Sequence, residues 1–180
     1  MRDYPRKQSG MVLLVSLTLL LLLSVLGLTS LQSAVQQEKM AGSVWFANQS
    51  LQAAETGLRM GEAQVQTQWR ELLACSAPTR CVPPSSARTQ VLPGLDPQSG
   101  VLWLKAPEGV FGLQSIGAGV TPAHWPGIAS AHFYRVTAVG VRGPSRTVLE
   151  SVYVRYQPAE SEANEPVRQQ FRRIMWRQIQ

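Results

Sequence analysis

A long apolar segment near the N-terminus limits what this chain can fold into more than any other feature. No Asp, Glu, Lys or Arg occurs between Met11 and Gln37, and residues 11–28 are apolar except for three hydroxyl residues and one glycine. About 20 residues at about 1.5 Å each span the hydrocarbon core of a bilayer. A buried helix of a soluble domain keeps one polar face, and this segment has none. We therefore predict a transmembrane helix over residues 11–33.

The charges that flank this segment predict its orientation. Arg2, Arg6 and Lys7 precede it together with a single acidic residue, whereas Glu38 and Lys39, which follow it, cancel each other. Excess positive charge keeps a flanking segment in the cytoplasm. No second segment approaches the length needed to span a bilayer. We expect a single-pass inner-membrane protein with a cytoplasmic N-terminus and a periplasmic C-terminal domain.

Helical periodicity continues beyond the membrane segment. Residues 34–74 are expected to form an amphipathic outer helix, because apolar residues recur there at three- and four-residue steps. The stripe consists of Val44, Ala47, Leu51, Ala54, Leu58, Val65, Trp69 and Leu72. No proline interrupts the two segments, so they are predicted to be one rod over about residues 11–73. Three glycines mark places where this rod could bend or locally melt: Gly27, Gly42 and Gly61.

The two cysteines, Cys75 and Cys81, are six positions apart. In an oxidising periplasm this spacing predicts a local disulfide, and the chain-entropy model assigns a loop of this size about 2 kcal/mol of stability. The spacing is not that of a CxxC redox motif, and no set of histidines completes a zinc site.

Residues 75–157 are predicted to form a small β-rich domain. Two segments rich in Val, Tyr and Thr, residues 132–141 and 146–156, flank an Arg-Gly-Pro-Ser turn and predict an antiparallel hairpin. Residues 101–105 and 110–116 are shorter candidate strands. The predicted fold class is α+β, with a long N-terminal helix whose outer half packs on a small antiparallel sheet.

Residues 158–180 are predicted to form a polar, basic C-terminal tail, in which three acidic residues precede several arginines. On a helix, Val167, Phe171 and Ile174 would share one face, with the arginines elsewhere. Such a basic amphipathic helix would contact a membrane, DNA or a partner. A disordered, solvated tail is the alternative.

The N-terminal leader resembles a class III signal, the substrate of prepilin peptidase. A short basic leader, residues 1–10, ends at Gly10, and the apolar segment begins at Met11. Ordinary secretory signals instead place a small-residue cleavage site after a shorter apolar region. The resemblance implies cytoplasmic cleavage between Gly10 and Met11, N-methylation of Met11, and retention of the helix as the core of a filament.

The outer helix resembles the PilX-type minor pilins of type IV pilus assembly. The segments EKMAG from Glu38, NQSLQAAE from Asn48 and GLR from Gly57 carry this resemblance. Together with the leader they cover about residues 7–62. The segment YRVTA from Tyr134 also fits the C-terminal hairpin of that family. The resemblance implies a pilin-like fold.

One position departs from the general pilin pattern. Most pilins carry a glutamate five residues after the cleavage site, where it is thought to neutralise the N-terminal amine of the neighbouring subunit. This chain has Val15 there. Because an unpaired charge in an apolar core is costly, a subunit with Val15 is best tolerated where no subunit lies ahead of it. The lack is shared by PilX-type pilins and by related type II secretion minor pseudopilins.

The resemblance therefore implies a minor pilin that primes filament assembly and lies at the tip. Its implied partners are other minor pilins, the major pilin, a tip adhesin, prepilin peptidase and the inner-membrane assembly platform. The implied processes are pilus biogenesis, twitching motility and adhesion. Two alternatives are a type II secretion minor pseudopilin and an uncleaved inner-membrane anchor with a periplasmic binding domain.

Other features of the sequence do not point to catalysis or to nucleic acid. The net charge of +6 includes three basic residues of the leader, and a basic balance by itself mostly reports a solvated surface. His124 and His132 are the only histidines. No GxSxG, P-loop or HExxH motif occurs, and the carboxylates are scattered. We expect no enzymatic activity, no cofactor and no nucleic-acid partner.

Overall fold

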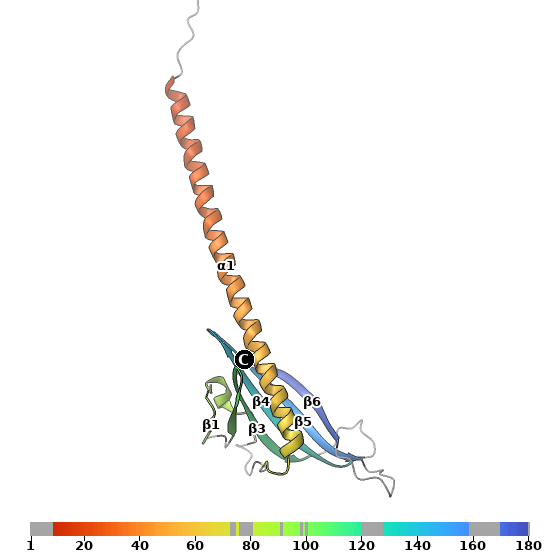
Figure 1. The fold of residues 1–180 in the computed structure, drawn as a ribbon. Coiled ribbons are helices and arrows are strands. Elements are labelled where there is room, and N and C mark those ends of the chain that lie inside the picture. Colours follow the sequence, from red (N-terminus) through yellow and green to blue (C-terminus); the bar gives the residue numbers. More distant parts are fainter. Residues whose placement is uncertain are drawn as a thin grey trace, which may run out of the picture. The chain divides into compact units, whose positions relative to one another are not determined.

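The computed structural model describes residues 9–72, 75, 81–90, 92–97, 99, 101–119, 128–158 and 170–179. The chain divides into two compact units, one ending at Val44 and the other beginning at Trp45. The fold combines a long N-terminal helix with an antiparallel sheet, so the predicted α+β class is confirmed (Figure 1).

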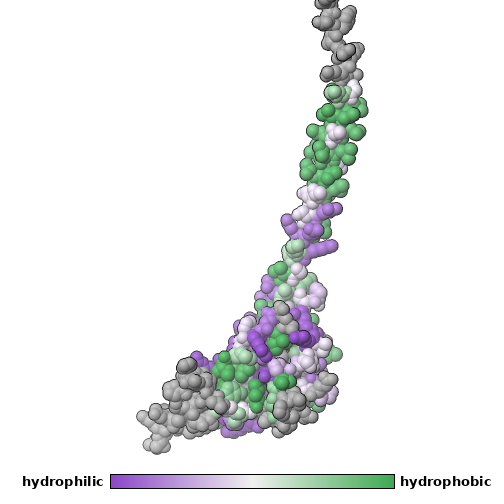
Figure 2. Space-filling model, turned by 180° about the vertical axis from the view of Figure 1, so that it is seen from behind, coloured by the Kyte–Doolittle hydropathy of each residue, from purple (hydrophilic) through white to green (hydrophobic). Residues whose placement is uncertain are grey.

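Helix α1, Ser9–Gln68, comprises 60 residues. Its first part is long and apolar enough to cross a membrane, and Figure 2 shows this part as a continuous apolar surface. The Ser16, Thr18 and Thr29 hydroxyls each donate a hydrogen bond of 2.9 Å to the carbonyl three residues earlier. These hydroxyls are therefore satisfied within the helix, as a hydrocarbon environment requires.

The outer end of α1 differs slightly from the prediction. The helix ends at Gln68, and residues 69–72 form turns, whereas the expected rod continued to residue 73. At this point Trp69 packs against the core, and the Arg155 guanidinium lies 3.6 Å from the centre of its ring. The chain leaves the helix here to make these contacts.

The second unit contains a six-stranded sheet in the order β1-β2-β3-β4-β5-β6, and each pair of adjacent strands is antiparallel. The strands are β1 Gly94–Leu95, β2 Leu102–Ala106, β3 Gly109–Ala118, β4 Ile128–Arg142, β5 Ser145–Pro158 and β6 Gln170–Ile179. A short 3-10 helix, η2 Ser85–Arg88, precedes β1. All four predicted strand segments fall within, or within one residue of, β2 to β5.

The predicted hairpin is confirmed as β4–β5. Its strands pair from Ile128 opposite Pro158 to Arg142 opposite Ser145. Gly143 has a φ of 52° at the turn, a conformation that glycine adopts without steric cost. The tight turn places two long strands side by side, and both are interior strands of the sheet.

The outer part of α1 packs on one face of this sheet (Figure 1). The buried cluster joins α1 to β2, β3, β4 and β5, and consists of Ala54, Leu58, Val65, Ala106, Phe111, Tyr134, Val136, Ala138 and Leu149. The predicted apolar stripe is therefore the packing face from Leu51 onward. Val44 and Ala47 are exposed, because the first helix residue buried against the sheet is Ser50, which hydrogen-bonds Thr147 at 2.8 Å.

A second, smaller cluster packs on the other face of the sheet. It consists of Ala87, Val101, Trp103, Val110, Val139 and Val148. Arg146 secures η2 and the residues after it, because its guanidinium donates to the carbonyls of Ala87, Thr89 and Gln90 at 3.0–3.3 Å. The segment after the cysteines is thus a cover for the second face.

The prediction for the C-terminal tail is wrong over residues 170–179. These residues form strand β6, paired antiparallel with β5, and are neither an amphipathic helix nor a solvated tail. Apolar residues such as Phe171 and Ile174 are irregularly spaced in this segment, so the sequence fits the period of a helix as well as that of a strand. Pairing with the free edge of β5 decides between them. Val167 lies outside the described residues.

Gly61 was predicted as a bend, but it lies in uninterrupted helix against the sheet. A Cβ at Gly61 would collide with Val136 and lie 3.1 Å from Phe111. The contact at Gly140 is closer still, because a Cβ there would collide with the Ser50 carbonyl oxygen and the Ala54 nitrogen. Both glycines allow the backbones of helix and sheet to approach each other.

We expect Gly140→Ala to destabilise the second unit by about 1–3 kcal/mol, the usual range for overpacking, because backbone atoms of α1 cannot move aside. Gly57→Ala is the matched control. Its Cβ would meet Ala138 at 3.4 Å, an ordinary contact, and alanine favours helix. Urea unfolding of the full chain in detergent measures both. Equal stability of the two variants would contradict the close approach.

Candidate functional site

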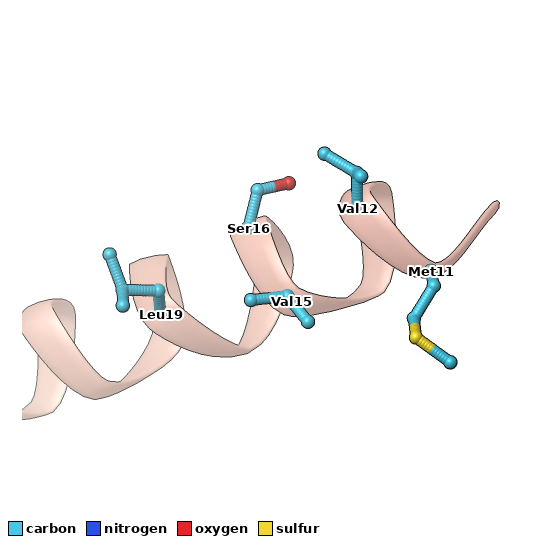
Figure 3. Close-up of a pocket in the computed structure, with 5 residues that line it drawn as sticks. All are labelled: Met11, Val12, Val15, Ser16 and Leu19. Atoms are coloured by element: carbon cyan, nitrogen blue, oxygen red, sulfur yellow. The ribbon is translucent and has the colours of Figure 1, made fainter. Parts of the chain in front are cut away.

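The first turns of α1 carry the positions predicted to matter for function. Figure 3 shows Met11, Val12, Val15, Ser16 and Leu19 along a shallow apolar surface of the helix. Val15 is 56% exposed and Met11 is 66% exposed. The only polar side-chain atom among these five is the Ser16 hydroxyl, which donates to the Leu13 carbonyl.

This surface offers no charge to a partner. Residues 11–37 include no Asp, Glu, Lys or Arg, and the large apolar side chains of this part of α1 are exposed. A continuous exposed apolar surface indicates contact with lipid or with other apolar surfaces. The surface can therefore be covered by acyl chains or by similar helices.

The predicted processing junction lies at the beginning of α1. Gly10 and Met11 both belong to the helix, which starts at Ser9. A Cβ at Gly10 would meet nothing within 4 Å, so no neighbouring atom in the structure covers this position. The remainder of the predicted leader, residues 1–8, lies outside the described residues.

Residues 9–59 match the family model described as PilX N-terminal. Over these residues the chain is similar to PilX-type pilins. The match covers most of α1 and stops before the sheet, so it supports the resemblance of the helix and not that of the β4–β5 hairpin. No curated protein and no solved structure matches the chain. The match supports a type IV pilus-related minor pilin at the family level, and PilX family pilins are structural, non-enzymatic proteins.

The predicted cysteine pair lies where the chain passes from α1 to the sheet. In the structure Cys75 and Cys81 are bonded, with their Cα atoms 5.5 Å apart. The Cys75 amide donates to the Ser115 carbonyl of β3 at 2.9 Å, and Arg135 of β4 donates to the Cys81 carbonyl at 2.6 Å. Both ends of this short loop are thus attached to the second unit.

The histidines are not brought together with other ligands. His132 is half-buried in β4, and His124 lies outside the described residues. Within the described part of the chain, no three His, Cys, Asp or Glu side chains are grouped so that they could hold a metal ion. The described residues therefore give no reason to propose a metal or cofactor site.

Sequence reasoning missed a charged cluster in the second unit. Glu62 of α1 and Glu150 of β5 are buried, and each contacts an arginine of β6. One signal was available, since Glu150 interrupts an otherwise apolar and hydroxyl-rich segment. The arginine partners were not predictable, because the tail was not recognised as a strand.

We expect the double substitution Cys75→Ser with Cys81→Ser to lower the stability of the second unit by about 2 kcal/mol, because the loop between α1 and β3 is no longer closed covalently. Urea unfolding of the full chain tests this, and mass spectrometry without reductant tests whether the bond forms in cells. A fully reduced pair in periplasmic material would contradict the predicted disulfide.

Proposed function

We propose that this chain is a PilX-type pilin that is cleaved after Gly10, methylated at Met11, and inserted through α1 into a type IV pilus, where it primes assembly and occupies the tip. The observation that carries the proposal is the apolar first turn of α1, with exposed Val15 at the fifth position after the junction. The proposed orientation, N-terminus in the cytoplasm and second unit in the periplasm, rests on the basic leader.

The tip position follows from the cost of an unpaired charge. Cleavage would create a positively charged amine at Met11, and such an amine is costly in an apolar filament core unless a carboxylate lies beside it. The first turns of α1 offer only the hydroxyls of Ser16 and Thr18, which are already used within the helix. This subunit therefore cannot neutralise the amine of another subunit packed against it. A place with no subunit ahead of it removes the need.

Priming follows from the exposed apolar surface of α1. In the inner membrane this surface can pack beside the helices of other minor pilins, and the complex can then receive major pilin from the assembly platform. The proposed partners are other minor pilins, the major pilin and a tip adhesin, with prepilin peptidase as the processing enzyme. Twitching motility and adhesion would depend on this subunit through pilus assembly.

The N-terminal peptide of the mature protein tests the processing step. We expect mass spectrometry to find N-methylated Met11 in cells with prepilin peptidase, and residues 1–10 still attached in cells without it. An intact leader in both strains would instead identify an uncleaved membrane anchor, and the tip proposal would fall with the pilin mechanism.

A carboxylate at the fifth position tests the tip proposal. We expect Val15→Glu to let the subunit accept a neighbour's amine, so that it enters the filament shaft and fewer pili are primed. Val15→Gln has the same size without the charge and serves as the control. Pilus counts by electron microscopy and co-purification of minor pilins give the readout. An unchanged pilus count and unchanged co-purification of minor pilins in the Val15→Glu variant would contradict the tip proposal.

A further inference from the structure

Two buried carboxylates of the second unit, on different elements, contact arginines of β6. Glu62 of α1 is 6% exposed and Glu150 of β5 is 0% exposed. Buried carboxylates are costly unless cations and hydrogen-bond donors surround them. Both carboxylates obtain such partners from β6, the last strand of the sheet.

Glu62 is held by three hydrogen bonds. Arg173 of β6 donates from Nε to Oε1 at 2.7 Å and from Nη2 to Oε2 at 2.5 Å, the paired geometry that guanidinium and carboxylate groups favour. Ser151 of β5 donates to Oε1 at 2.7 Å. The hydrogen bond to Glu62 raises the pKa of Arg173 above its ordinary value. Without β6, Glu62 would lose its cation.

Glu150 is held between two arginines. Arg177 of β6 donates from Nε to Oε1 at 3.0 Å, with its Nη2 2.8 Å from the same oxygen. Nε of Arg135, on β4, lies 3.2 Å from Oε2. Burial lowers the pKa of Arg135 below its ordinary value, although Glu150 opposes this effect. Without β6, one cation would remain beside Glu150.

The two carboxylates lie on opposite faces of the sheet. Leu149 and Ser151 contact α1 or the core beneath it, so Glu150, the residue between them, points to the other face. In a regular strand, positions 173 and 177 would share a face. The pairing of β6 shifts between Val152 opposite Met175 and Tyr153 opposite Arg173, which leaves Ile174 as the extra residue of a bulge. The bulge directs the two arginines to opposite faces.

Polar contacts account for most of the attachment of β6. None of its residues is fully buried, and Ile174 and Trp176 are 39% and 47% exposed. Phe171 stacks on Tyr153 with ring centres 6.3 Å apart, and Ile179 reaches only the margin of the second cluster. An element with little buried apolar surface opens locally at lower free energy than the core. β6 is such an element.

We propose that the edge of β5, with Glu62 and Glu150 beside it, is a docking groove for an extended strand that carries two arginines, and that a strand of this chemistry from a partner subunit replaces β6. Strand addition satisfies the main chain of an open edge, and side-chain sites give it specificity. Here the specificity elements are two carboxylates on opposite faces. They require two arginines that point to opposite faces, which β6 achieves with arginines four positions apart and one bulge residue between them.

The charges at the groove favour this occupant over an acidic strand. With β6 displaced, both carboxylates would remain at the groove, and of their ion pairs among the described residues only that of Glu150 with Arg135 would be kept. An incoming strand without cations would leave Glu62 unpaired. This inference concerns the second unit alone and does not rest on the tip position or on processing of the leader.

A peptide with the sequence of residues 170–179, labelled with fluorescein, is the probe. It is titrated against the full chain in detergent micelles, with Arg173→Gln and Arg177→Gln introduced to loosen the resident strand. We expect saturable binding, measured by fluorescence anisotropy. A peptide with glutamine at both arginine positions should bind at least about 30-fold more weakly, as expected when one partner of a buried charge pair is lost.

A second control peptide lacks the residue that corresponds to Ile174. It keeps both arginines, now three positions apart, so a regular strand without a bulge still directs them to opposite faces, and we expect it to bind as the original peptide does. The matched chain control is Arg142→Gln, which removes an exposed ion pair with Glu108 far along the chain from β6. This chain should bind the peptide no better than the unmodified chain does. Equal binding of the three peptides, or no binding to the loosened chain, would overturn the proposal.

The unmodified chain provides a measurement that does not depend on the folding of a variant. The peptide is made with a photoreactive phenylalanine at the position of Phe171 and added in excess. Cross-links should map to β5 around Tyr153, where Phe171 stacks. Cross-links confined to other segments, or none above a scrambled peptide, would count against a groove at the edge of β5.

Discussion

The close approach of α1 to the sheet determines much of the second unit. At Gly140 the backbones of helix and strand lie so near that no Cβ fits between them. The buried cluster formed by Leu58, Val65 and Leu149 depends on that distance, because side chains of this size fill the space only when the two elements are in direct contact. The same approach brings Glu62 to the edge of β5, where Ser151 and Arg173 can reach it.

The two parts of the chain treat charge in opposite ways. The first part of α1 excludes it, and its few hydroxyls are satisfied by carbonyls of the same helix. The second unit buries Glu62 and Glu150 and surrounds each with donors from different elements. A bilayer cannot supply partners for a charge, whereas a sheet beside a helix can. Charge is therefore absent from the exposed apolar part of α1 and concentrated where elements of the second unit meet.

The parts of the fold that were predictable from sequence follow from periodicity over long segments. The apolar helix keeps one composition over ten residues or more, and the stripe from Leu51 onward and the β4–β5 hairpin each keep one pattern over a similar length. Strand β6 was not predictable, since its bulge at Ile174 disturbs the alternation and its pairing depends on the distant edge of β5. The role of Gly61 was misjudged for a related reason: a glycine within a helix pattern can indicate a bend or a close neighbour, and only the sheet decides. For the candidate site, the positions of Gly10, Met11 and Val15 came from the leader resemblance, while the carboxylate cluster required the tertiary structure.

The attachment of α1 has a mechanical consequence. The buried part of the helix is fixed near its beginning, where Ser50 meets Thr147. It is also fixed beyond its end, where the Cys75 amide bonds to β3 and Arg135 bonds to the Cys81 carbonyl. A tensile load carried along α1 would therefore reach the sheet as shear distributed over the whole helix–sheet contact. Peeling would have to begin at a bonded end, and one of these ends is closed by a covalent loop.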